Sequence, residues 1–176
     1  MTKLVITGPE SCGKTTLAGG LCTAWPGAYV PEVAREYLGV LDRPYRESDL
    51  LAIAKAQLDL EDAMAAWPGQ THVVCDTDLI TLRIWGAEKY GRCDPWIAVQ
   101  TEQRPYDHWL LCSPEGIAWE PDPLRENPGD RERLFQRHIA LLDSLGKPYT
   151  VLLGDRQARL DLALAIARKV EQDRNR

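Results

Sequence analysis

Short apolar runs alternate along the chain with longer segments in which apolar residues recur every three or four positions. The short runs cover residues 3–7, 28–30, 71–76, 107–113 and 148–154. Nearly continuous apolar runs of this length are typical of parallel strands that helices cover on both faces. The pattern therefore predicts an α/β fold of three layers with a five-stranded parallel sheet.

The longer segments carry helical periodicity and end at helix-stopping residues. Helices are expected within residues 15–25, 48–67, 79–90, 130–146 and 155–176. Ser48 and Asp130 are suitable capping residues for two of them, which end at Pro68 and Gly146. A chain of 176 residues is in the range of one domain, so we expect a single domain over residues 1–176.

One segment departs from this regularity. Residues 112–130 contain four prolines and two glycines and show no helical or strand periodicity. Loops of this length inside a compact domain are more often functional than accidental. We therefore expect a lid loop over about residues 114–130.

The composition of the chain limits the kinds of partner that we expect it to bind. The net charge of −5 argues against broad binding to nucleic acid or to an anionic membrane surface, and no apolar run has the length of a membrane span. The five cysteines are scattered and form neither CxxC pairs nor metal-ligand clusters, which favours reduced thiols and a cytoplasmic protein. No sequence feature indicates an oligomeric state.

Candidate chemistry begins with the stretch GPESCGKTT at residues 8–16, which matches the phosphate-binding P-loop pattern directly after the first strand. Its glycines let backbone N–H groups turn toward an anion, Lys14 reaches the β and γ phosphates, and the Thr15 hydroxyl ligates Mg²⁺. The residues expected to hold the nucleotide are Gly8, Glu10, Ser11, Cys12, Gly13, Lys14, Thr15 and Thr16. The motif predicts binding of ATP with Mg²⁺, although the pattern alone does not exclude GTP.

Two aspartates follow the third predicted strand. An acid in this position holds Mg²⁺ in P-loop proteins, because the metal prefers hard oxygen ligands. Asp76 is therefore expected to bind the metal together with Thr15. Asp78 is expected either to bind substrate or to cap the helix that follows.

Charged residues also follow the second predicted strand, in the stretch PEVAREYL. If a helix starts after Pro31, Glu32 and Glu36 lie on one face, with Arg35 beside them. Either glutamate is a candidate to accept a proton from an attacking hydroxyl, and all three side chains are candidates to bind an acceptor substrate. The alternative is a solvated ion pair.

The expected lid loop and the helix after it contain cations that would meet the charge of a phosphoryl group in transit. Arg125, Arg131 and Arg133 are the candidates for this catalytic role. Asp122 and Trp119 are candidates to bind the acceptor, Trp119 by stacking, with packing inside the loop as its alternative. Trp85, in an expected helix, is assigned to the core.

Taken together, these motifs resemble the ribosylnicotinamide kinase domain of the bacterial NadR family. The resemblance rests on GPESCGKTT, PEVAREYL, DTDLITLRIWG, the WEPDPLR loop and GKPYTVL, in that order along nearly the whole chain. It implies a P-loop NTPase fold of the nucleoside and nucleotide kinase type. It also implies MgATP-dependent phosphorylation of the 5'-hydroxyl of nicotinamide riboside, which gives nicotinamide mononucleotide.

The residue types agree with a cationic acceptor that carries no phosphate. A pyridinium ring favours aromatic faces and carboxylates, whereas a phosphorylated acceptor favours an arginine clamp. Arg35 is compatible with a phosphorylated acceptor, so a kinase for another nucleoside, nucleotide or small metabolite is one alternative. A nucleotide-responsive regulatory ATPase is the other.

Overall fold

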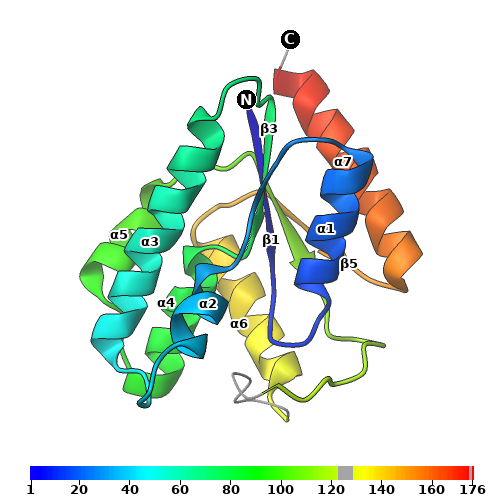
Figure 1. Cartoon of the computed structure of the whole chain (residues 1–176). Helices are drawn as coiled ribbons and strands as arrows, with labels where there is room; N and C mark the ends of the chain where they lie inside the picture. The colour runs from blue at the N-terminus through cyan, green and yellow to red at the C-terminus, as the bar shows by residue number, and fades with distance from the viewer. Residues whose placement is uncertain (123–128, 175) are drawn as a thin grey trace.

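The computed structural model describes residues 1–122, 129–174 and 176. Five strands form one parallel sheet in the order β2-β3-β1-β4-β5 (Figure 1). The strands are β1 (Thr2–Thr7), β2 (Ala28–Val30), β3 (His72–Asp76), β4 (His108–Cys112) and β5 (Tyr149–Leu152). The predicted five-stranded parallel sheet is confirmed, and each predicted strand agrees with an observed one to within two residues.

Seven helices are found among the described residues. They are α1 (Lys14–Ala24), α2 (Val33–Gly39), α3 (Glu47–Ala66), α4 (Leu79–Tyr90), α5 (Pro95–Gln103), α6 (Arg131–Ser144) and α7 (Arg156–Arg174). Only α5 has no counterpart among the sequence predictions, although Asp94 accepts a hydrogen bond from the Trp96 N–H and Pro95 occupies the first helical position. None of the helices in the described part of the chain has the length and apolarity needed to cross a membrane.

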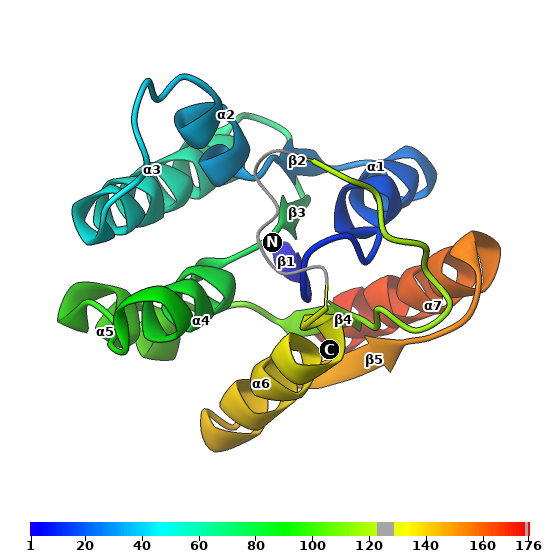
Figure 2. The same cartoon turned by 90° about the horizontal axis from the view of Figure 1, so that it is seen from below.

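The sheet separates two helical layers (Figures 1 and 2). Leu4 and Ile6 of β1 point to one face, where they pack with α1 and α7, and Val5 points to the other, where it packs with α4 and α6. A further apolar cluster joins α2, α3, α4 and α5 beside the second layer. Residues on both sheet faces are buried, as the continuous apolar runs predict.

The carboxyl ends of the parallel strands meet at one edge of the sheet. The P-loop follows β1, Asp76 ends β3, and the long loop follows β4, so these distant segments converge at that edge. Viewed onto this edge in Figure 2, the loop after β4 runs past the P-loop toward α2. Ligands of open α/β sheets bind at this edge, which is where the candidate site lies.

A buried carboxylate stabilises the contact between α3 and the segment that leads into β4. Glu61 is 1% exposed, and its Oε2 accepts hydrogen bonds from the Tyr106 hydroxyl (2.7 Å) and from Arg104 Nε (3.3 Å). Burial raises the pKa of Glu61 to about 7, although both neighbours act to lower it. Folded Glu61 therefore keeps its proton at pH values where the unfolded chain has released it.

The ordinary pKa of a glutamate, 4.5, applies to the unfolded chain, and the raised pKa of about 7 applies to the folded chain. As the pH rises from 4.5 to about 7, the free energy of unfolding should therefore lose a contribution from Glu61. Glu61→Gln keeps a carbonyl oxygen for both donors and removes the titration. Between about pH 5 and pH 8, we expect the variant to gain about 1–3 kcal/mol of stability relative to the native chain. Denaturant unfolding across this range checks the result, with exposed Asp59→Asn on the same helix as the control. An identical pH dependence in Glu61→Gln and the native chain would contradict it.

Candidate active site

The P-loop joins β1 to α1 and folds tightly against the end of β4. Gly8 has a φ of +141°, and a β-carbon there would lie 2.7 Å from the carbonyl oxygen of Cys112, so a side chain is excluded. Gly13, with a φ of +85°, immediately precedes the first turn of α1. The unpaired N–H groups of that turn and the helix dipole attract an anion. The motif therefore has the strand, loop and helix context that phosphate binding requires.

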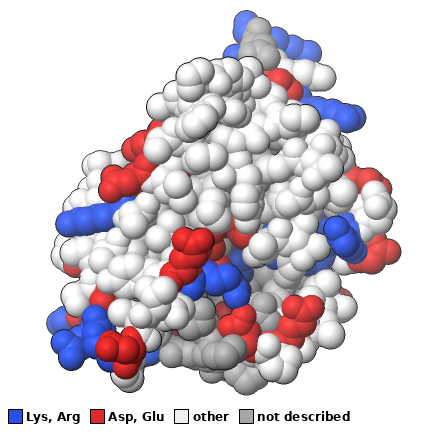
Figure 3. Space-filling view, viewed as in Figure 1, with Lys and Arg blue, Asp and Glu red and all other residues white. Residues whose placement is uncertain are grey.

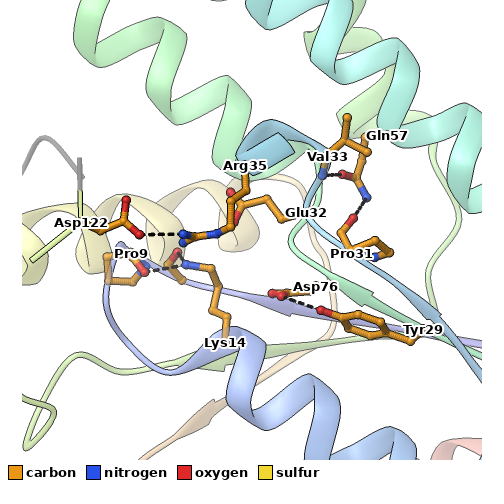
Figure 4. Close-up of polar contacts among 11 residues, drawn as sticks. Pro9, Lys14, Tyr29, Pro31, Glu32, Val33, Arg35, Gln57, Asp76 and Asp122 are labelled. Carbon is orange, nitrogen blue, oxygen red and sulfur yellow. Dashed lines mark hydrogen bonds and ion pairs between the residues drawn. The ribbon is translucent and has the colours of Figure 1, made fainter. Parts of the chain in front are cut away.

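The Lys14 side chain folds back over the P-loop. Its Nζ donates hydrogen bonds to the carbonyl oxygens of Pro9 (2.7 Å) and Gly8 (3.0 Å), the first of which is drawn in Figure 4. Burial lowers the pKa of Lys14, but nearby negative charges, including those of Glu32 and Asp76, outweigh this effect and raise it. Lys14 is therefore a cation at the mouth of the loop.

The end of β3 supplies a carboxylate suited to a metal ion. Asp76 is 1% exposed, and its Oδ2 accepts a hydrogen bond from the Tyr29 hydroxyl at 3.1 Å (Figure 4). Its Oδ1 is also buried, yet it has no hydrogen-bond partner among the described residues. A buried orphan carboxylate oxygen fits a Mg²⁺ ligand, either directly or through water. No group of three or more His, Cys, Asp or Glu residues in the described part of the chain could hold a metal without further ligands.

A cavity of about 380 Å³ opens between the P-loop and the helices of the second layer. On the face shown in Figure 3, acidic and basic side chains gather around a hollow in the lower half of the view. The cavity is lined by every residue from Gly8 to Thr16, by Glu32, Ala34, Arg35 and Leu38, by Thr81, Ile84 and Trp85, and by Ile117, Glu120, Leu134 and His138. All eight residues predicted to hold the nucleotide thus border one cavity.

The two candidate glutamates after β2 have different surroundings, because Glu32 precedes helix α2 and Glu36 lies within it. α2 begins at Val33, so Glu32 is its extended N-cap residue and does not share a helical face with Glu36 as the sequence predicts. Glu32 lines the cavity with 15% of its side chain exposed, whereas Glu36 is exposed and is not among the lining residues. Burial and neighbouring Asp76 raise the pKa of Glu32, against the lowering effect of Lys14. The structure therefore brings only Glu32 to the cavity.

Arg35 connects α2 to the long loop. Its Nη1 forms an ion pair with Asp122 Oδ2 at 2.7 Å, and its Nε lies 4.0 Å from Glu32 Oε2 (Figure 4). These contacts bring acceptor-site candidates from two distant segments together, Glu32 and Arg35 from the segment after β2 and Asp122 from the loop after β4. Arg35 thus faces a carboxylate of the protein, which weakens its case as a clamp for a phosphorylated acceptor.

The three candidate arginines of the loop and α6 have different surroundings. Arg131 Nη1 donates to the carbonyl oxygens of Ser11 (3.0 Å) and Ile117 (2.9 Å) and does not belong to the described cavity lining. Arg133 forms an ion pair with Glu88 of α4 at 2.7 Å, outside the lining. Backbone and carboxylate oxygens of the protein bind both arginines here, and their role at a transferring phosphoryl group stays a prediction. Arg125 lies outside the described residues.

Asp78 and Trp119, which the sequence also predicts to bind the acceptor substrate, are not among the residues that line the cavity. Asp78 is 2% exposed, and its carboxylate accepts hydrogen bonds from Trp109 Nε1 (2.8 Å) and the Thr7 hydroxyl (3.4 Å). Burial raises the pKa of Asp78 to about 6. Trp119 is half-buried, with the Arg131 guanidinium 5.7 Å from its ring centroid. In this structure Asp78 joins β3 to β1 and β4, and Trp119 packs beside α6.

The helices contribute a largely apolar part of the cavity wall that the sequence reasoning missed. Trp85, which the sequence predicts to be a core residue, is half-buried and borders the cavity as well as packing against the α3 cluster. His138 is 2% exposed, and burial lowers its pKa to about 4, so it is a neutral wall residue. Helical periodicity identifies a buried face, but it does not tell whether that face meets a helix or a cavity.

The P-loop lies at the carboxyl edge of a five-stranded parallel sheet, and the buried Asp76 ends β3, the strand beside β1. This arrangement defines a P-loop nucleotide-binding protein. The family model described as AAA domain matches residues 3–159, and the chain belongs to this family. Comparison with curated protein sequences gives no match.

Solved structures with the same fold include two of NadR protein. The one in complex with NR has a TM-score of 0.82, and the one in complex with NAD and AMP-PNP has a TM-score of 0.74. Each is 20% identical and covers 97% of this chain, which spans about half the length of the NadR chains, 52% and 49%. A deoxyadenosine kinase from M. mycoides, solved with products dCMP and a flexible dCDP bound, has a TM-score of 0.60 at 12% identity, over 96% of this chain and 100% of its own. The NadR-like P-loop kinase fold that the motifs predict is therefore confirmed.

Proposed function

We propose that the chain is a kinase domain that transfers the γ-phosphoryl group of ATP to the 5'-hydroxyl of nicotinamide riboside. The observation that carries the proposal is the position of Glu32, a half-buried carboxylate that lines the same cavity as the P-loop. A base beside a phosphate site suits a hydroxyl acceptor, because a carboxylate accepts the proton that the hydroxyl loses.

The proposed reaction divides the work among residues of this chain. The P-loop amides and Lys14 bind the phosphates of ATP, and Glu32 accepts the proton as the acceptor oxygen bonds to the γ-phosphorus and the bond to ADP breaks. Thr15 and Asp76 would hold Mg²⁺, which neutralises phosphate charge when it is bound. Trp85 would offer an aromatic face to the base of the acceptor.

Two observations support nicotinamide riboside as the acceptor. The cavity combines Trp85 with Glu10, Glu32 and Glu120, an inventory that suits a cationic pyridinium ring. Arg35, which would favour a phosphorylated acceptor, is already paired with Asp122. The fold shared with a NadR structure in complex with NR, nicotinamide riboside, agrees with this choice.

A kinase for another nucleoside is the second candidate, because the fold is also shared with deoxyadenosine kinase structures. The test is the purified chain with MgATP and, in parallel, nicotinamide riboside, deoxyadenosine, deoxycytidine or no acceptor. We expect nicotinamide riboside to be converted with the highest kcat/KM and ATP to be hydrolysed slowly without an acceptor. Nicotinamide mononucleotide, in which the 5'-oxygen is already phosphorylated, is the matched control and should not react.

Other outcomes of this panel separate the candidates. A preference for a deoxynucleoside would show that the chain is a kinase but that nicotinamide riboside is not its acceptor. Hydrolysis of ATP at the same rate with and without every acceptor would favour a regulatory ATPase and refute the proposed kinase.

A further inference from the structure

Two arginines from different helices donate hydrogen bonds to consecutive carbonyl groups of the P-loop. Arg131 Nη1, from α6, donates to the Ser11 oxygen at 3.0 Å, and Arg159 Nη1, from α7, donates to the Cys12 oxygen at 3.0 Å. Neither arginine is among the residues that line the described cavity. Both therefore hold the loop from outside the space where phosphates would bind.

The planar peptide bond gives these contacts a consequence for the amide groups of the loop. In a trans peptide the carbonyl oxygen and the N–H of the next residue point in opposite directions, and the described residues contain no cis peptide. An arginine that fixes the Ser11 oxygen on the outer side thereby turns the Cys12 N–H inward. Arg159 does the same for the Gly13 N–H through the Cys12 oxygen.

Ser11 needs such support because its backbone conformation is unfavourable. Its φ of +53° lies in the left-handed region, which is unfavourable for a residue with a side chain. Besides the Arg131 contact, the Ser11 hydroxyl accepts a hydrogen bond from the Glu120 N–H at 3.0 Å. Left-handed residues such as Ser11 and Gly13 let successive N–H groups converge into an anion-binding concavity.

Arg159 is an unusual residue for a protein interior. It is 4% exposed, and it donates to the carbonyl oxygens of Gly154 (2.8 Å), Cys12 (3.0 Å) and Glu115 (3.3 Å). No carboxylate forms an ion pair with it among the described residues. A buried cation is tolerated only when its donors are satisfied, and without a counter-ion its field extends into the neighbouring P-loop.

Cys12, whose carbonyl oxygen binds Arg159, also has a buried thiol. Burial alone raises a thiol pKa, but a hydrogen bond with Cys112 and the charges of Lys14 and Arg159 bring the pKa of Cys12 down to about 7. The same positive field would favour the phosphates of a nucleotide. Arg159 thus contributes both orientation and charge from behind the loop.

We propose that Arg131 and Arg159 are positioning residues that hold the P-loop amides in the phosphate-binding orientation without contacting the phosphates. Because Arg131 also binds the Ile117 oxygen and Arg159 the Glu115 oxygen, the loop after β4 and the P-loop are held as one unit. The inference rests on nucleotide binding in the proposed function, but it does not depend on the identity of the acceptor.

The test compares Arg131→Lys and Arg159→Lys with Arg156→Lys, an exposed arginine at the start of α7. Lysine keeps the charge but loses the planar set of donors. Calorimetry measures the Kd of the full chain for ATP and for tripolyphosphate, and steady-state kinetics gives the KM of the acceptor. We expect both Kd values to rise about 10-fold to 100-fold in the two test variants, while the acceptor KM and the control stay unchanged.

Three results would overturn the inference. Kd values within about threefold of the native chain would show that the carbonyl contacts do not organise the amides. A fall in kcat for Arg131→Lys with an unchanged Kd for ATP would place Arg131 at the transferring group. A rise in Kd that merely follows a lower melting temperature and a higher acceptor KM would indicate general loosening of the fold.

The two variants keep the test informative if one of them fails to fold. Tripolyphosphate binding also separates this inference from the proposed function. A native chain that binds tripolyphosphate but does not phosphorylate nicotinamide riboside loses the proposed acceptor, and the variants still decide the role of the arginines. A native chain that binds neither ATP nor tripolyphosphate refutes both.

Discussion

Replacement of Lys14 by methionine is expected to lower kcat about 10²-fold to 10³-fold. Lys14 Nζ lies at the P-loop, where it donates to the Pro9 and Gly8 carbonyl oxygens. On binding of ATP these contacts exchange for the β and γ phosphates, whose negative charge grows on the leaving oxygen during transfer. Methionine fills a similar volume without the charge, so the loss should appear in kcat more than in the Kd for ATP.

Lys169→Met is the matched control for Lys14→Met, because Lys169 is exposed on α7, away from the cavity lining. Single-turnover assays at saturating ATP measure the transfer step directly. Circular dichroism and the melting temperature establish that the variant is folded. If Lys14→Met transfers phosphate at a rate within about tenfold of the control, the role of Lys14 in stabilising transferred charge is wrong.

Glu32→Gln is expected to lower kcat/KM for the acceptor about 10²-fold to 10³-fold, while the Kd for ATP changes little. Glutamine keeps the shape of the side chain but accepts no proton at neutral pH. In the native chain, the raised pKa of Glu32 should place the acidic limb of the kcat/KM profile above the ordinary glutamate value of 4.5. Activity should fall as the pH drops through that limb, because protonated Glu32 cannot act as the base.

Glu36→Gln separates the catalytic reading of Glu32 from a general charge effect. Both substitutions remove one negative charge from the same segment, but Glu36 is exposed outside the cavity lining. We expect Glu36→Gln to retain native kcat/KM and the native pH profile. Equal losses in the two variants, or an acidic limb that survives in Glu32→Gln, would remove Glu32 from the role of base.

The pattern of apolar runs predicted the strands most clearly in β1, β3 and β4, because these central strands are buried on both faces and leave a continuous signal. α5 gave a weaker signal, since only Ile97 and Thr101 of its nine residues are buried. Asp94 and Pro95 do mark its start, and reading them as cap and first residue would have found it. The order of the strands depends on which segments pair at long range, so local patterns did not give it.

The site was predictable where a motif fixes the local backbone and less so elsewhere. The P-loop residues line the cavity together because their spacing encodes one loop. The choice between Glu32 and Glu36 depended on the first residue of α2, and sequence patterns locate helix ends only to within a few residues. Arg159 belongs to a helical segment with many charged residues, and nothing local distinguishes a buried arginine there from an exposed one such as Arg156.

The position of β1 in the sheet has a consequence for how the chain is made. β1 pairs with β3 and β4, which end at residues 76 and 112, so neither neighbour exists when the ribosome releases β1. At roughly 5–20 residues per second, on the order of 3–14 s pass before β3, the first of these neighbours, follows. Leu4, Val5 and Ile6, all fully buried in the native fold, have no neighbouring strand for at least this time. The segment that leads into the P-loop is thus one that nascent-chain chaperones have reason to shield.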